Sequence, residues 1–393
     1  MFGYGKGSSL GAGLVKSAFL VGFLAYACHT LVAFILFLGL NKRVFNHVPG
    51  GCSVVAGPEH GAADIEFVPA TGLFFVTSGL RLFNQSFAGK NTRVVGKIYS
   101  YNATAKTSWD VPLKSGSLTP NKFNPHGISS YVVKPTRGNE RFKTYLFVVN
   151  HRKKSDAVEI FRYGTKRLSS GKLESEPLLN HISTVKSPLF RHLRDVQALT
   201  ERRFYATSAY YFDDARLINL EEFLTLKLGS VLYYDGANVT HACRWIATPT
   251  GLALDNSKKY LYVASGGDEA IHVFFIKKSG ALKHKSKIEL SSLPYNLFVQ
   301  PRTGDIFVGC QPVRMKFFRY QMTPQDIYSP SQVLKVRGRP EAKRPQWLVS
   351  EPYANDGATV SAATAAAAVG DHLLIGGLHG RLVDCELEAA ALM

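Results

Sequence analysis

The segment Tyr260–Ile276 has the sequence YLYVASGGDEAIHVFFI and decides the fold class. Two runs of β-branched and aromatic residues flank the turn signal Gly-Gly-Asp, a pattern that predicts an antiparallel β-hairpin. Similar runs recur between turn signals, and no linker or charge block interrupts the chain after Pro49. We expect further strands within residues 72–79, 145–150, 157–163, 203–212, 229–235, 304–310, 314–320 and 373–377.

Many short strands in one body are compatible with a propeller, an array of sandwiches or two β domains. The chain has 393 residues, 46% of them hydrophobic and 19% charged, so it can bury a large core and is not disordered. Cys52 and Cys385 stand at the two ends of the β-rich body, which is typical of a closure disulfide in an oxidising compartment. Pairing the first and last strands in one blade would join these cysteines and remove exposed sheet edges. We therefore favour a propeller and expect an all-β fold.

Two segments depart from the strand pattern. Residues 217–228, LINLEEFLTLKL, carry apolar side chains at three- and four-residue spacing, which predicts an amphipathic helix. Residues 361–369 are rich in alanine and locally helix-prone. Their place directly before the run at 373–377 nevertheless favours a strand.

The N-terminal region contains 25 uncharged residues, SAFLVGFLAYACHTLVAFILFLGLN, between Lys16 and Lys42. About 20 apolar residues suffice to span a bilayer. A signal peptide is the alternative, but its apolar region usually has about 7–15 residues followed by a cleavage site with small residues. Because this run is longer and ends in Asn-Lys-Arg, we expect a retained transmembrane anchor at 17–41 after a cytosolic tail at 1–16.

Three glycosylation sequons indicate on which side of the membrane the β-rich body lies. They begin at Asn84, Asn102 and Asn238. Together with the terminal cysteines, they predict a single-pass protein whose C-terminal domain is lumenal or extracellular, in the endoplasmic reticulum, the plasma membrane or both.

The formal net charge is +18, from 47 Lys and Arg against 29 Asp and Glu. Such a surplus suits an acidic partner, an anionic lipid surface or nucleic acid. The basic residues are scattered, with short clusters at 151–154, 202–203 and 337–344, and they form no basic helix or aromatic-interleaved stripe. We therefore expect no nucleic-acid partner and favour a solvated surface over a docking face for an acidic partner or anionic headgroups.

Five blocks of sequence, taken in order, resemble the paraoxonases, the serum arylesterases and lactonases. They are residues 52–80, FNPHGIS at 123–129, LFVVNH at 146–151, GDIFVGC at 304–310 and DCEL at 384–387. The resemblance implies a six-bladed β-propeller over residues 49–387, with its first and last strands tied by a Cys52–Cys385 disulfide. It also implies two calcium ions in the central tunnel, one structural and one that polarises an ester or lactone carbonyl, and a nearby histidine pair that activates water.

The ligands that the resemblance implies for the structural calcium are all present. They are the carboxylates of Asp64 and Asp195 and the backbone carbonyl of Ile128. Calcium takes about 6–8 oxygen ligands, so waters or other carbonyls would complete the shell. We expect one structural calcium here, although both aspartates could instead cap turns.

The positions that correspond to the catalytic calcium are degraded. The family's two carboxylates are replaced by Ala63 and Tyr295, and two of its amides by Arg194 and Thr250, so that only Asn296 remains unchanged. A hard dication needs anionic or strongly dipolar oxygens, and a guanidinium stays protonated. We therefore expect no second calcium, and we predict that Arg194 occupies the vacated position and substitutes for the metal's charge.

The histidine pair persists as His126 and His151. Without the metal, nothing obvious would stabilise a developing oxyanion. We interpret both histidines as vestigial residues with a structural role and assign no catalytic residue.

Three functions fit these features. Some nematode members of the family act as chaperones or accessory subunits for the assembly and surface delivery of degenerin-type sodium channels, and the resemblance implies that this chain does the same for a membrane-protein partner. A calcium-dependent arylesterase or lactonase is the alternative. A scavenging lectin-like or lipid-binding propeller is a weaker third possibility.

Overall fold

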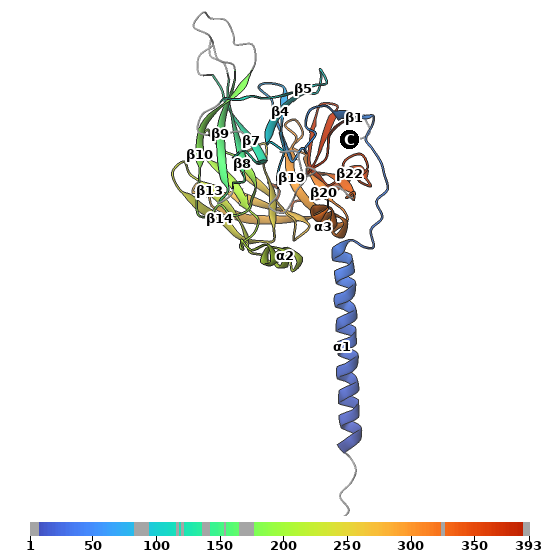
Figure 1. Cartoon of the computed structure of the whole chain (residues 1–393). Helices are drawn as coiled ribbons and strands as arrows, with labels where there is room; N and C mark the ends of the chain where they lie inside the picture. The colour runs from blue at the N-terminus through green and yellow to red at the C-terminus, as the bar shows by residue number, and fades with distance from the viewer. Residues whose placement is uncertain are drawn as a thin grey trace, which may run out of the picture.

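The computed structural model describes residues 8–81, 94–114, 118, 122–135, 142–152, 155–164, 177–323 and 327–387. Six β-sheets are arranged as the blades of a propeller, and one long helix leaves the body on one side (Figure 1). The first strands of the blades contact one another in a closed ring. The prediction of an all-β, six-bladed propeller preceded by an apolar N-terminal helix is therefore confirmed.

Five blades consist of strands that follow one another in sequence from the axis outward, and each is antiparallel. They comprise β2 (Asp64–Val68), β3 (Leu73–Ser78), β4 (Lys97–Asn102) and β5 (Thr107–Asp110); β7 (Pro125–Val133), β8 (Lys143–Asn150), β9 (Ala157–Gly164) and β10 (Leu178–Val185), with β6 (Leu113–Lys114) added in parallel to β10; β11 (Leu193–Ala198), β12 (Phe204–Ser208), β13 (Gly229–Tyr234) and β14 (Val239–Ile246); β15 (Pro249–Leu254), β16 (Tyr260–Ser265), β17 (Ala270–Ile276) and β18 (Leu282–Glu289); and β19 (Leu293–Val299), β20 (Ile306–Gln311), β21 (Ser331–Gly338) and β22 (Trp347–Asn355).

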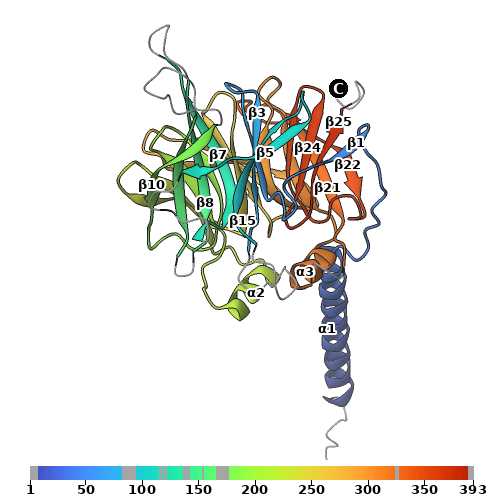
Figure 2. The same ribbon diagram turned by 45° about the horizontal axis from the view of Figure 1, so that its top comes forward.

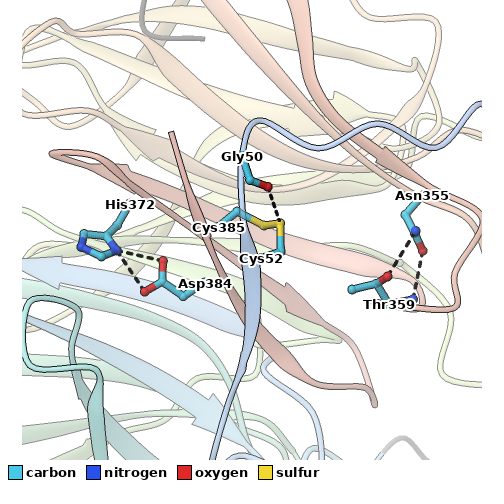
Figure 3. The surroundings of a disulfide bond; sticks show 7 residues. All are labelled: Gly50, Cys52, Asn355, Thr359, His372, Asp384 and Cys385. Atoms are coloured by element: carbon cyan, nitrogen blue, oxygen red, sulfur yellow. Dashed lines mark hydrogen bonds and ion pairs between the residues drawn. A yellow bond between two sulfur atoms is a disulfide. The ribbon is translucent and has the colours of Figure 1, made fainter. Parts of the chain in front are cut away.

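The sixth blade closes the ring with strands from both ends of the domain. It contains β23 (Ala363–Val369), β24 (His372–Gly377) and β25 (Leu382–Glu386), and β1 (Cys52–Val55) pairs with β25 as the outermost strand. Cys52 lies directly opposite Cys385 in this pairing, and the two form a disulfide across 333 residues of chain (Figure 3). The disulfide expected from the sequence is therefore present, and it ties the first strand to the last.

The inner strands of five blades contain an irregularity near their first residues. In β7, for example, Pro125 pairs with Asn150 and Ile128 with Val148, so one extra residue is accommodated on the inner strand. Equivalent register shifts occur in β11, β15, β19 and β23. A bulge of this kind bends the strand and re-aims side chains, here beside the propeller axis.

The N-terminal helix α1 runs from Ser8 to Leu38, so it begins before the predicted anchor at 17–41 and ends three residues earlier. Its segment Gly13–Leu38 is long and apolar enough to cross a membrane by length and composition. Gly39 follows in the left-handed region, with φ of 69°, where a helix commonly ends.

The end of α1 is held against the propeller. Leu38 is buried, and the Phe37 ring lies 4.2 Å from the guanidinium carbon of Arg314. Lys42 Nζ donates a hydrogen bond of 2.6 Å to the carbonyl of Ser291. The helix is therefore fixed to the body through a specific contact rather than by a loose tether.

Two predicted elements need correction. Residues 314–320, expected as a strand, lie in helix α3 (Arg314–Met322), because their buried members Arg314, Phe317 and Tyr320 repeat every three residues. The helix expected at 217–228 is α2 (Ala215–Phe223), which the side chain of Asp214 caps by accepting from two backbone N–H groups. Residues 361–369 do contain the expected strand, β23. Figure 2 shows α2 and α3 on the side of the propeller from which α1 leaves.

Candidate functional site

The predicted site residues gather where the inner strands begin. Asp64 is the first residue of β2, and Ala63 directly precedes it. Two more of these residues, His126 and Ile128, lie on β7. Arg194 and Asp195 lie on β11. Thr250 lies on β15, and Tyr295 and Asn296 lie on β19. Because the inner strands form a closed ring, residues from separate blades meet beside the axis. Arg194 lines a cavity that residues of α2 and α3 also line.

Asp64 and Asp195 lie side by side and are both buried. Asp64 accepts backbone hydrogen bonds from Ile65 at 2.9 Å and Ile128 at 2.8 Å. Burial raises the pKa of Asp64 to about 7, although these hydrogen bonds oppose the shift. Burial and the neighbouring Asp64 also raise the pKa of Asp195 well above its usual value. Two adjacent buried carboxylates therefore lack a compensating positive charge within their hydrogen-bond set.

This carboxylate pair fits a calcium ion by its donor chemistry. A Cβ added at Gly127 would lie 2.5 Å from Asp195 Oδ1, so the space that the carboxylate occupies exists only because position 127 is glycine. Two carboxylates with a carbonyl such as that of Ile128 form an oxygen set of the type that calcium prefers. The described residues contain no cluster of three or more acidic, histidine or cysteine side chains, so this site would use only two protein carboxylates.

The positions expected to have lost the catalytic calcium do not fit that ion. The Thr250 hydroxyl donates to the Pro294 carbonyl at 3.0 Å, and the Tyr295 ring packs against Phe317 with 5.5 Å between centroids. Asn296 Nδ2 donates to the Ala63 carbonyl at 2.9 Å. The surviving amide thus bridges two blades by a hydrogen bond, and we derive no chemical step through a second calcium.

Arg194 belongs to a hydrogen-bonded chain that reaches helix α2. Its guanidinium donates to the Tyr210 hydroxyl at 3.3 Å, and its central carbon lies 5.4 Å from the Tyr210 ring centroid. The Tyr210 hydroxyl in turn donates to Glu222 Oε2 at 3.0 Å. The side chain is half-buried and lines a cavity, so it is not directed into bulk solvent.

The two histidines form a relay with an aspartate. Nδ1 of His126 lies 3.0 Å from Nε2 of His151, and Nδ1 of His151 lies 2.8 Å from Asp156 Oδ1. Although burial opposes it, the nearby His151 lowers the pKa of Asp156, which therefore stays ionised and takes the Nδ1 proton of His151 as its hydrogen-bond donor. His151 Nε2 then accepts from His126. Nε2 of His126 is buried without a hydrogen-bond partner among the described residues, and burial lowers the pKa of this histidine well below its usual value.

A cavity of about 1210 Å³ opens beside these groups. His151, Asp156, Arg194, Tyr210 and Glu222 line its polar side. Its other wall is apolar and comes from the helices, through Ile218 and Phe223 of α2 and Phe318 and Met322 of α3. The arrangement can hold a ligand with one polar end and one apolar part.

Sequence reasoning missed Asp156, Tyr210 and Glu222. Asp156 lies five residues after His151 in the turn between β8 and β9, and a carboxylate at that hairpin end was a usable signal. Tyr210 and Glu222 gave no such signal, because their contact depends on how α2 packs against the blade formed by β11, β12, β13 and β14.

The three sequons lie in different settings. Asn238 is exposed in the turn before β14, and Asn102 is half-buried at the end of β4, where its Oδ1 accepts from the Ala105 N–H at 3.0 Å. Asn84 lies outside the described residues. Glycosylation at all three positions stays a prediction.

Comparisons with known proteins identify the family of this β-propeller protein. A family model described as Arylesterase matches residues 45–387. The chain is 32% identical over 378 residues to serum paraoxonase/arylesterase 2 of Gallus gallus, covering 95% of this chain and 100% of that protein. It is 30% identical over 367 residues to Mechanosensory abnormality protein 6 of Caenorhabditis elegans, covering 91% and 92%. Serum paraoxonase/lactonase 3 of Oryctolagus cuniculus is 32% identical over 366 residues, covering 93% and 96%.

These matches extend over most of the chain. The protein belongs to the arylesterase, or paraoxonase, family, as the five sequence blocks indicated.

Proposed function

We propose that this protein is a membrane-anchored, non-hydrolytic member of the paraoxonase family. In this proposal it acts as a chaperone or accessory subunit for the assembly and surface delivery of a membrane protein such as a degenerin-type sodium channel. The observation that carries the proposal is the chemistry at four axial positions: a methyl at Ala63, a guanidinium at Arg194, a hydroxyl at Thr250 and a phenol at Tyr295. At an effective dielectric near 20, a cation about 4 Å from the metal position would repel each unit of its charge by roughly 4 kcal/mol.

Two further features support a role at a membrane. Helix α1 is long and apolar enough to serve as an anchor. The similarity to Mechanosensory abnormality protein 6 extends over nearly the full length of both chains. We propose a single-pass topology with the propeller on the lumenal or extracellular side, in the endoplasmic reticulum, the plasma membrane or both.

Paraoxonases are generally calcium-dependent proteins. We propose that this chain keeps one structural calcium, held by Asp64, Asp195 and the carbonyl of Ile128, and lacks the second. The ion would supply the positive charge that the adjacent buried carboxylates need, and it would tie the first, second and third blades together at the axis.

A calcium-dependent arylesterase or lactonase is the second candidate. The observation in its favour is the His126–His151–Asp156 relay, in which a carboxylate orients a histidine pair as in general-base catalysis. Calcium-dependent hydrolysis of phenyl acetate or a simple lactone by the purified protein separates the two candidates.

The accessory role is tested by co-expression of the full chain with a degenerin-type channel and labelling of surface protein. We expect several-fold more channel at the surface, unchanged delivery of an unrelated membrane protein, and recovery of the channel when the full-length protein is affinity-captured. Equal channel delivery with and without the chain would contradict this role.

A further inference from the structure

The cavity beside the axis has two chemically different walls. The inner wall, made by the ends of strands in blades two and three, contributes Arg152, Arg194 and His151. The outer wall, made by α2 and α3, contributes aromatic and aliphatic side chains. A ligand that makes favourable contacts with both walls must carry a polar group at one end and a hydrocarbon portion at the other.

The charge at the inner end is positive and only partly offset. Arg194 has five N–H donors, and its hydrogen bond within the described part of the chain goes to the neutral Tyr210 hydroxyl. Among the described residues no carboxylate lies within ion-pair distance of Arg194 or Arg152. Glu222 is linked to Arg194 by hydrogen bonds through Tyr210 and also acts on its charge from a longer distance. The guanidinium therefore presents free donors to the cavity.

Three carboxylates line the cavity, and each has a hydrogen-bond or ion-pair partner. Glu222 accepts from the Tyr210 hydroxyl at 3.0 Å. Asp156 accepts from His151 and from the Leu193 N–H at 2.6 Å. Asp213 lies 3.4 Å from His192 Nε2 and 3.9 Å from Arg191. None of these three carboxylates makes a hydrogen bond to Arg194, so its guanidinium N–H groups that face the cavity are available to an incoming anion.

The apolar wall stands next to the membrane anchor. Phe223 of α2 packs edge-on against Phe34 of α1, with 5.1 Å between ring centroids. Phe318 is half-buried and Met322 is exposed, so the rim is accessible to a hydrocarbon chain. A ligand with its charge at Arg194 would have its tail directed toward the rim beside α1.

We infer that the cavity binds a free carboxylic acid with an aliphatic chain, its carboxylate held by Arg194 and its hydrocarbon portion packed between α2 and α3. A planar guanidinium matches a carboxylate in geometry as well as in charge. The position implied by the resemblance for a cation that polarises a carbonyl thus becomes an anion site. This inference does not depend on the proposed accessory role, because it rests on the cavity alone.

The test uses the full chain in nanodiscs of neutral phosphatidylcholine. Calorimetric titration with octanoate and with 1-octanol, corrected for empty discs, separates the carboxylate from the hydrocarbon contribution. We expect saturable octanoate binding that is about tenfold or more tighter than octanol binding, as a charge-assisted hydrogen bond predicts. Equal binding of the two compounds to the wild-type chain would overturn the inference.

Two variants and a control assign the site. Arg194→Gln should weaken octanoate binding about tenfold and leave octanol unchanged, whereas Phe318→Ala should weaken both compounds. Arg203→Gln, which changes an exposed arginine at the far end of the same blade, should alter neither. Unchanged octanoate affinity in a folded Arg194→Gln protein would contradict the assignment, and the wild-type comparison still decides if that variant fails to fold.

A final titration distinguishes a free carboxylic acid from an anionic lipid headgroup as the ligand of the cavity. In discs that contain anionic phosphatidylglycerol, octanoate should still bind the wild-type chain with the same affinity. Loss of octanoate binding in these discs, with recovery on removal of the anionic lipid, would assign the cavity to lipid headgroups and overturn the free-acid assignment.

Discussion

Two neighbouring residues of strand β11 contribute to different sites at the axis. Asp195 presents a buried carboxylate to Asp64, whereas Arg194, the residue before it, presents a cation to the cavity. Ala63 and Asp64 form a similar pair on the first blade. Because successive side chains of a strand point in opposite directions, one strand end can contribute to two sites, and one site can be lost while the other is kept.

Calcium binding at Asp64 and Asp195 predicts a metal-dependent stability. A ligand that binds only the folded state at about 100 times its Kd adds about 2.7 kcal/mol, so calcium should raise the unfolding midpoint by several degrees relative to chelator. Asp195→Asn should abolish this shift. Asp110→Asn, at an exposed ion pair with Lys97, should keep it. A wild-type midpoint that is the same in calcium and in chelator would contradict the proposed site.

His379 predicts a loss of stability in mild acid. Burial lowers the pKa of His379 from 6.5 to about 3. Between these two pH values the imidazole binds a proton in the unfolded state but not in the folded state. Stability therefore falls as the pH drops from about 6.5 toward 3, by about 1.4 kcal/mol per pH unit at most, or about 2 kcal/mol at pH 5. His379→Gln should show a correspondingly smaller difference between urea unfolding at pH 7.5 and pH 5. The exposed His60→Gln should behave like the wild type, and equal pH dependence in all three proteins would exclude this cause.

At the scale of elements, the strands were predictable because their hydrophobic runs and turns are local signals. Helix α3 was not, since the aromatic residues of MKFFRY suit either structure and only the burial of Phe317 and Tyr320 decides. The bulges at the starts of the inner strands were also invisible, although they set where His126 and Asp195 point. Residues aligned by family resemblance could thus be located at the axis, whereas the contacts that α2 makes with them depend on tertiary packing.

The junction between α1 and α3 predicts a fixed anchor. Arg314 is fully buried, donates to the Gly266 carbonyl at 2.7 Å and lies against the Phe37 ring. Phe37→Ala should release the end of α1 and increase trypsin cleavage after Lys42 and Arg43 several-fold, with little change in the stability of the propeller. The control Phe19→Ala changes an exposed ring on the same helix. Equal cleavage of both variants would show that the contact does not hold the anchor.

At the scale of the whole molecule, ring closure depends on one short strand. β1 has four residues, and its pairing with β25 is secured by the Cys52–Cys385 disulfide. Sequence could suggest this closure from two cysteines at the ends of a β-rich body. It could not reveal the cavity, because that space is formed by helices from two different blades.

Removing the disulfide should destabilise the propeller without changing its fold. The double variant Cys52→Ser with Cys385→Ser should lose about 2–5 kcal/mol of unfolding free energy. Cys310→Ser, a buried unpaired cysteine, tests whether loss of a buried sulfur alone has the same effect. Unchanged stability of the double variant under non-reducing conditions would contradict a closing role for the disulfide.

The proposed loss of the catalytic metal position is tested most directly by measuring calcium-dependent hydrolysis of phenyl acetate or a simple lactone by the purified full-length protein. We predict no turnover above background, with or without chelator. Combining Ala63→Glu, Arg194→Asn, Thr250→Asn and Tyr295→Asp should produce chelator-sensitive activity, since the His126–His151–Asp156 relay is intact. Turnover by the unmodified protein that disappears when calcium is removed would contradict the proposal and make the arylesterase the correct function.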